Sequence, residues 1–329
     1  MQPQPPGEAP RRGHPYRAFV IRAGLGAAIV TFLLWRFAGR SVLHTLTRED
    51  PAWFVGAVCV YIAGQLLSSK RWQLLAGALG LGGPYWEYVR YYFIGMFTNL
   101  FVPGLLGGDA ARSIYLGRQH KQLAAAIASA VADRVAGLLG LFWLAAFAAM
   151  FLNRNGLPPT VTRPVIAIGV VTIGGLAAAP WLVRVIYLLP GTLRRAGEEI
   201  ALYLHRPRTM MIPIALSVGL HISLAICQWM LARGLGLSAK LTLFVLVVPI
   251  ANVAASLPVT FNGLGLRETA YLFLLGMAGI GHDDAIALGL LWFAATMLGG
   301  LTGAIAFITT PTPVGQPVSS SQTPPLTSK

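Results

Sequence analysis

An apolar run that ends in helix-breaking residues and then in charge constrains this chain more than any other feature. The eighteen residues from Tyr91 to Gly108 carry no charge, so the run is long enough to enter a bilayer. Pro103 and the glycines near it interrupt a helix, and Asp109 and Arg112 follow one helical turn apart. Lipid satisfies neither free backbone groups nor unpaired charges. The run therefore predicts a helix broken at membrane depth, whose open backbone and charges face protein or a watery cavity.

The composition places the chain among integral membrane proteins. Hydrophobic residues make up 55% of the 329 residues and charged residues 11%, with a mean hydropathy of +0.65. In a soluble domain about a quarter of the residues are charged. Because a bilayer admits only structures whose backbone groups are paired, and because the apolar runs are long, we expect an all-α, polytopic helical fold.

The formal net charge of +14 does not indicate a nucleic-acid partner. The basic residues lie in short groups between apolar segments, as membrane topology requires, and they form no continuous basic patch. Cys59 and Cys227 lie inside apolar segments, so no disulfide framework is expected. The six histidines lack metal-ligand spacing, and we expect no metal and no other cofactor.

Six segments are predicted to cross the membrane, and two more are predicted to enter it and return. The plain spans are residues 18–35, 51–69, 135–152, 164–183, 210–232 and 285–309, and the interrupted segments are residues 91–108 and 241–266. Residues 191–208 are charged and periodic, which favours a helix on the membrane surface. Residues 18–310 would form one membrane domain between disordered, proline-rich tails at 1–17 and 311–329.

The second interrupted segment resembles the first in its ingredients. Pro258 and the pair Asn262-Gly263 break it, and Arg267 and Glu268 follow. The positive-inside rule is best satisfied when both termini are cytoplasmic, and the two interrupted segments then dip in from opposite sides. Two discontinuous segments in opposite orientation are typical of the midplane site of a transporter.

Each break supplies a helix start whose free amides, partial positive charge and glycines suit an anion. Arg112 and Arg267 would add full charges for a phosphate. Asp109 and Glu268 could hold a cationic or hydroxylated head group, or take up a coupling proton or sodium ion. Asp109 could instead cap the helix after Gly107–Gly108 and pair with Arg112. Arg267 and Glu268 could instead form structural ion pairs, with separate partners because neighbours on a helix do not face each other.

Four further groups are interpreted from their positions along the chain. Asp133–Arg134 most simply open a span as a cap and an anchor, although they could pair with the first interrupted segment. Lys70–Trp72 is interpreted as the cytoplasmic end of a span, with lipid head-group contact as the alternative. The aromatic residues from Tyr85 to Phe93 are typical of an interface belt. Asn99 and Asn262 are expected to bind backbone groups that the breaks leave open.

The motifs at these positions resemble those of the flippase-like transmembrane module of lysylphosphatidylglycerol synthases, which also occurs alone in bacterial and archaeal membrane proteins. The matching pieces are Arg71-Trp72, N-x-x-x-P-G-x-x-G-G-D-x-x-R from Asn99 to Arg112, Asp133-Arg134, and G-x-G-x-R-E from Gly263 to Glu268. The resemblance implies a helical domain with re-entrant elements that moves a lipid between leaflets. The site residues it implies are Asn99, Pro103, Gly107, Gly108, Asp109, Arg112, Asp133, Arg134, Gly263, Gly265, Arg267 and Glu268.

The chain departs from the family pattern in two places. It ends shortly after its last predicted span, where the synthases continue into a soluble aminoacyl-transferase domain, so it is not expected to make lysylphosphatidylglycerol. Residues 259–262 are polar and poor in glycine where the pattern favours glycine. Asn262, in this stretch, joins the candidate substrate-binding residues.

The leading functional hypothesis is a translocator of a polar or anionic lipid, such as a phospholipid or a polyprenyl-phosphate-linked lipid. The alternative is a non-transporting, lipid-binding membrane partner of a separately encoded glycosyl or acyl transferase. An intramembrane enzyme acting on a polyprenyl phosphate is a third hypothesis, and the sequence offers it no nucleophile–base pair. We therefore expect no enzymatic activity, and a location in the cell membrane with both termini cytoplasmic.

Overall fold

The part of the chain that the structure describes is built from α-helices and contains no strand. The computed structural model describes residues 44–101, 107–153, 157–178, 181, 203, 207–256 and 266–310, and of residues 207, 208, 255, 256 and 266–268 it describes the backbone alone. The helices are α3 (Pro51–Ala78), α4 (Tyr85–Asn99), α5 (Gly107–His120), α6 (Leu123–Phe151), α7 (Pro159–Ala177), α10 (Pro207–Gly234), α11 (Leu241–Ser256), α12 (Leu266–Met277), α13 (His282–Leu301) and α14 (Gly303–Thr309).

Within the described ranges, five helices are long and apolar enough to cross a membrane. They are α3, α6, α7, α10 from Thr209 to Gly234, and α13 continued by α14. The protein is therefore a polytopic helical membrane protein, as the sequence predicts. The first predicted span, residues 18–35, lies outside the described residues, as do both predicted tails and nearly all of the predicted surface helix.

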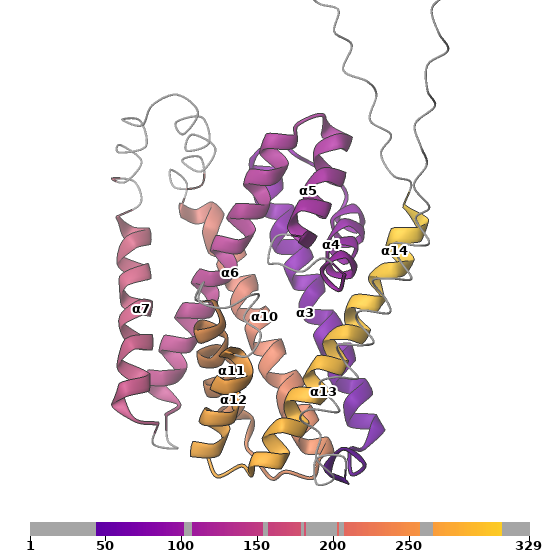
Figure 1. The fold of residues 1–329 in the computed structure, drawn as a ribbon. Coiled ribbons are helices and arrows are strands. Elements are labelled where there is room, and N and C mark those ends of the chain that lie inside the picture. Colours follow the sequence, from indigo (N-terminus) through magenta and orange to yellow (C-terminus); the bar gives the residue numbers. More distant parts are fainter. Residues whose placement is uncertain are drawn as a thin grey trace, which may run out of the picture.

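The two interrupted segments form hairpins that enter the bundle from opposite ends (Figure 1). Helices α4 and α5 have 15 and 14 residues. At about 1.5 Å per residue, neither reaches across a hydrocarbon core of about 30 Å. They pack against each other at the end of the bundle where α3 stops, and α11 and α12 form the second hairpin at the other end. Both hairpin tips, residues 102–106 and 257–265, lie outside the described residues.

Helix α3 corrects two sequence-based expectations. It runs through the predicted stop at Lys70 and continues to Ala78, which buries Arg71 and Trp72 inside the bundle. The interface-belt prediction for the aromatic residues from Tyr85 to Phe93 is wrong for the members that are buried, whereas Trp86 is 68% exposed. Tyr88 and Tyr91 are buried in a cluster with Trp72, whose ring meets that of Tyr88 edge-on at 5.1 Å. Basic or aromatic residues next to an apolar segment lie at the membrane interface only when no other part of the chain packs against them and buries them.

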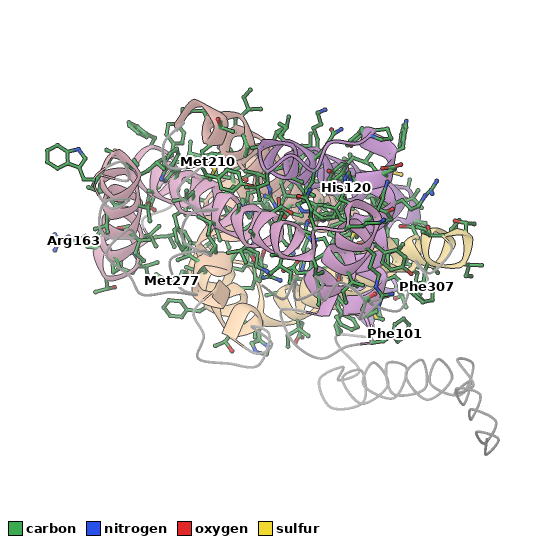
Figure 2. The ribbon with its side chains drawn as sticks, turned by 90° about the horizontal axis from the view of Figure 1, so that it is seen from above. Phe101, His120, Arg163, Met210, Met277 and Phe307 are labelled. Carbon is green, nitrogen blue, oxygen red and sulfur yellow. The ribbon has the colours of Figure 1, made fainter. Side chains whose placement is uncertain are left out.

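Small residues let the central helices approach each other closely. Helices α3 and α10 form the most extensive pair, and a Cβ on Gly64 would collide with Ser223 across it. A Cβ on Gly140 of α6 would likewise collide with Ser217 of α10. Such contacts are typical of membrane bundles, where packing replaces the hydrophobic effect between helices. In the view down the bundle (Figure 2), Arg163 on α7 and Phe307 on α14 lie on opposite sides of this centre.

Candidate functional site

The break between α4 and α5 is closed by a side chain from α4. Asn99 Oδ1 accepts a hydrogen bond of 2.6 Å from the backbone N–H of Gly108, in the first turn of α5. The two helices also touch through backbone, because a Cβ on Gly95 would lie 2.8 Å from the carbonyl oxygen of Gly108. Asn99 therefore occupies one of the amides that a helix start leaves open, and it fixes α5 against α4 beside the tip.

Asp133 lies at the centre of a buried set of ion pairs. One of its carboxylate oxygens accepts from Arg71 Nε of α3 at 2.6 Å, and the other accepts from Arg112 Nη2 of α5 at 2.8 Å. Arg71 also donates from Nη1 to Ser217 Oγ of α10 at 2.9 Å. The interpretation of Asp133 as a cap at the start of a span is wrong, because ten residues of α6 precede it and its side chain is buried. The alternative, pairing with the first interrupted segment, is what the structure shows.

Asp109 forms the second, outer part of the set. Its Oδ1 accepts from Arg112 Nε at 3.1 Å and lies 2.9 Å from Arg112 Nη2. Its Oδ2 accepts from Nε of Arg134, the residue after Asp133 on α6. The pairing of Asp109 with Arg112, left open by the sequence, is therefore present. We call these five residues the ion-pair network: Arg71, Asp109, Arg112, Asp133 and Arg134.

Aromatic rings hold the guanidinium of Arg112 in place. Its central carbon lies 4.6 Å from the ring centroid of Trp72 and 4.9 Å from that of Tyr92, within the range of cation–π attraction. Trp72 is itself fixed, since its Nε1 donates to Ser129 Oγ at 3.0 Å. Arg112 Nη1 is buried and has no hydrogen-bond partner among the described residues. One strong donor in the network is therefore unsatisfied.

The ion-pair network is buried at one side and reaches the surface at the other. The side chains of Arg71, Arg112 and Asp133 are all at most 5% exposed, whereas Asp109 is 19% and Arg134 is 37% exposed. Ten residues of α6 precede Asp133, which places it about 15 Å along the helix axis at about 1.5 Å per residue. Charges this deep persist only when they are paired.

The described part of the network is rich in arginine. It contains three guanidinium groups and two carboxylates. Arginine suits the recognition of carboxylate and phosphate because its planar guanidinium presents paired donors. The guanidinium groups of Arg112 and Arg134 are therefore chemically suited to contact an anionic group. No group of three His, Cys, Asp or Glu residues in the described ranges is placed to hold a metal ion.

The structure brings together the predicted site residues of the first half of the chain, namely Asn99, Gly107, Gly108, Asp109, Arg112, Asp133 and Arg134. It does not place those of the second half. Asn262, Gly263 and Gly265 lie outside the described residues, and Arg267 and Glu268 lie in the first turn of α12 without described side chains. A shared site between the two hairpins stays a prediction.

Sequence reasoning missed four contributors to this site: Trp72, Tyr92, Ser129 and Ser217. It also assigned Arg71 to an interface rather than to the network. A signal was present for Arg71, because a basic pair that follows a long apolar run and precedes another apolar segment can lie inside a single helix. The serines and aromatic residues carried no such signal, since both types are common in membrane helices.

Comparison with known proteins supports the resemblance found in the motifs. A family model described as the lysylphosphatidylglycerol synthase TM region matches residues 19–303, which includes the whole ion-pair network. The chain is also similar to a UPF0104 membrane protein of Methanothermobacter thermautotrophicus, with 23% identity over 335 residues. That similarity covers 88% of this chain and 94% of the relative.

Proposed function

Because the chain belongs to the family of lysylphosphatidylglycerol synthase transmembrane regions, we propose that it moves a lipid with an anionic or polar head group between the leaflets of the cell membrane. The observation that carries this proposal is the ion-pair network at the base of the α4–α5 hairpin. The network is a charged site inside a bundle of mostly apolar helices, and it lies beside the interruption between α4 and α5.

A head group must leave water to cross the bilayer, and it needs polar partners on the way. Arg134 is 37% exposed and Arg112 is buried, so the two guanidinium groups offer successive contacts to a head group that moves from the surface into the bundle. The acyl tails would remain in lipid. A purely structural ion pair would be expected to be small and neutral, since each buried charge is costly. This network joins five charged side chains, and Arg112 Nη1 has no hydrogen-bond partner among the described residues.

The substrate class that fits is a phospholipid or a polyprenyl-phosphate-linked lipid, whose phosphate suits guanidinium groups. We propose no enzymatic activity for the chain itself. With both termini in the cytoplasm, as the positive-inside rule favours, the α4–α5 hairpin would enter from the cytoplasmic side. The ion-pair network would then meet lipid of the inner leaflet first.

A reconstitution assay tests translocation directly. Purified protein is incorporated into vesicles that contain phosphatidylglycerol with a fluorescent acyl chain, and dithionite is added outside. Translocation exposes inner-leaflet lipid to the reductant, so fluorescence falls further than in protein-free vesicles. Arg134→Gln, at the exposed edge of the network, should slow this loss, whereas Arg163→Gln on the exposed face of α7 should not.

A rate equal to that of protein-free vesicles would contradict translocation by this chain alone. The alternative function would then be favoured by one further result, the co-purification of a glycosyl or acyl transferase whose activity requires the chain. Slowing by both arginine substitutions to the same degree would show that the assay reports surface charge rather than the network.

A further inference from the structure

We propose that Asp109 is an internal substitute for the phosphate of the lipid, and that a singly charged phosphodiester displaces it from Arg112 and Arg134. This inference rests on the proposed function and specifies how its site binds. In the structure, the Asp109 carboxylate holds the position on the two guanidinium groups that a phosphate would take. Carboxylate and phosphate oxygens bind guanidinium in the same paired geometry.

The two carboxylates of the network differ in how firmly they are held. Asp133 is buried and accepts hydrogen bonds from Arg71 and Arg112, which come from two different helices. Asp109 is partly exposed and lies in the first turn of α5, next to the hairpin tip. The loss of Asp133 would leave buried arginines without a partner, whereas Asp109 can leave toward solvent. Asp109 is therefore the exchangeable acid.

Arg112 is built to stay in place when Asp109 leaves. The rings of Trp72 and Tyr92 and the carboxylate of Asp133 fix its guanidinium independently of Asp109. Its Nη1, buried and without a partner among the described residues, is a donor that the Asp109 carboxylate does not satisfy. A buried unsatisfied donor is costly, so a ligand with more oxygens than a carboxylate gains by reaching it. A phosphate has such oxygens.

The contacts of Asp109 favour a single negative charge on the ligand. A phosphodiester monoanion that replaces the Asp109 carboxylate on Arg112 and Arg134 exchanges one negative charge for another. A choline head group would bring a cation close to three arginines, and like charges in a buried site repel. The site should therefore prefer phosphatidylglycerol to phosphatidylcholine.

Removal of the Asp109 charge tests the inference through binding. Purified wild-type protein and Asp109→Asn are titrated separately with soluble dihexanoyl phosphatidylglycerol, dihexanoyl phosphatidylcholine and inorganic phosphate. Because Asn lacks the competing charge, the substitution should tighten binding of phosphatidylglycerol by roughly tenfold to a hundredfold, the range of one charge-assisted hydrogen bond. Asp109→Glu keeps the charge and should bind like the wild type. Asp283→Asn, on the exposed start of α13, is the matched surface control.

Each outcome of the titrations decides between sources or against the inference. If Asp109→Asn binds only phosphatidylglycerol more tightly than the wild type does, the ligand is a lipid phosphate. If it binds only inorganic phosphate more tightly, the proposal that the phosphate belongs to a lipid is overturned. Unchanged or weaker binding of both by Asp109→Asn overturns the substitute role. If Asp109→Asn does not fold, Asp109→Ser removes the same charge and retains a good residue for a helix start, so the same criteria apply to it.

The vesicle assay separates this inference from the proposed function. Tighter binding by Asp109→Asn, together with no translocation by the wild type, would leave the binding site standing and overturn the transport function. Translocation by the wild type, together with no gain in binding by Asp109→Asn, would overturn the substitute role and leave the transport function standing.

Discussion

Gly95 of α4 and Gly108 of α5 lie against each other with no space for a side chain between them. A Cβ on Gly95 would lie 2.8 Å from the Gly108 carbonyl oxygen, and a Cβ on Gly108 would lie 2.5 Å from Asn99 Nδ2. These contacts are closer than non-bonded atoms tolerate. The glycine pair therefore sets the distance between the two helices of the hairpin, and with it the position of Arg112 against Asp133.

Gly108→Ala should push α5 away from α4 and destabilise the protein by about 1–3 kcal/mol, the usual cost of overpacking. It should also disturb the Asn99 hydrogen bond and slow lipid translocation. Thermal unfolding in detergent and the vesicle assay measure the two effects. Gly289→Ala in α13 is the control, because no described atom beyond its chain neighbours and the nearby backbone of α13 lies within 4 Å of its added Cβ. It should be neutral or stabilising, since alanine favours a helix over glycine.

Asp133→Asn should be the most damaging single change in the ion-pair network. It leaves Arg71 and Arg112 buried with their shared counter-charge removed. Removing one partner of a buried pair costs about 3–5 kcal/mol. We expect low yield and a strongly lowered melting temperature, measured by fluorescence-detected unfolding. Asp283→Asn on the surface should leave both unchanged, and equal stability of the two variants would contradict a buried role for Asp133.

Arg71→Lys should destabilise the protein although it keeps the charge. Arg71 reaches Asp133 and Ser217 with two different nitrogens at 2.6 and 2.9 Å. The single ammonium of lysine lacks this fork, so one of the two partners loses its donor, at a cost of about 1–3 kcal/mol. The comparison is Lys70→Arg, one residue earlier on the exposed face of α3, which should unfold like the wild type. An equal loss of stability in Arg71→Lys and Lys70→Arg would show that the contacts of Arg71 with Asp133 and Ser217 do not cause the destabilisation.

Glu49 should make stability depend on pH. It lies before α3, and both its carboxyl oxygens are buried without a hydrogen-bond partner among the described residues. Burial, and then the charge of Asp50, raise its pKa from 4.5 to about 7. Between these values the folded protein keeps a proton that the unfolded chain has lost, so stability falls as the pH rises through this window.

Glu49→Gln should remove this fall. Above pH 7 it should melt about 2–4 °C higher than the wild type, and near pH 5 the two should be closer. Thermal unfolding across the pH range measures both curves. Parallel curves for the wild type and Glu49→Gln would show that another group titrates, and Asp283→Asn should retain the wild-type slope.

The sequence predicted the features whose causes are local. Proline and glycine close together favour the end of a helix, and both hairpins were predicted correctly, with their entry from opposite ends. A single proline was not sufficient, because Pro249 lies inside α11. The apolar spans of α6, α7, α10 and α13 follow from composition in the same way. The pairing of Asp109 with Arg112 could also be predicted from their spacing of one helical turn on α5.

Features that depend on distant partners were not predicted. A basic pair after an apolar run is the usual end of a span, but α3 continues through Lys70 to Ala78. Lys70 itself lies on the surface, where its Nζ donates to Gln73 Oε1. Arg71 differs only because Asp133 meets it from a helix far along the chain. For the same reason Asp133 was assigned to a helix start, because the sequence near it does not show that Arg71 and Arg112 pair with it.

The separation of these partners along the chain has a consequence for biosynthesis. Arg71 lies inside α3, and Asp133 is synthesised 62 residues later. Until α6 emerges, α3 carries an unneutralised guanidinium, whose partition into lipid from the translocon costs about 2.5–3.5 kcal/mol. We therefore predict that α3 is released into the membrane more efficiently together with α6 than alone. Truncation of the nascent chain before Asp133 should leave α3 poorly integrated, and extension beyond α6 should restore integration.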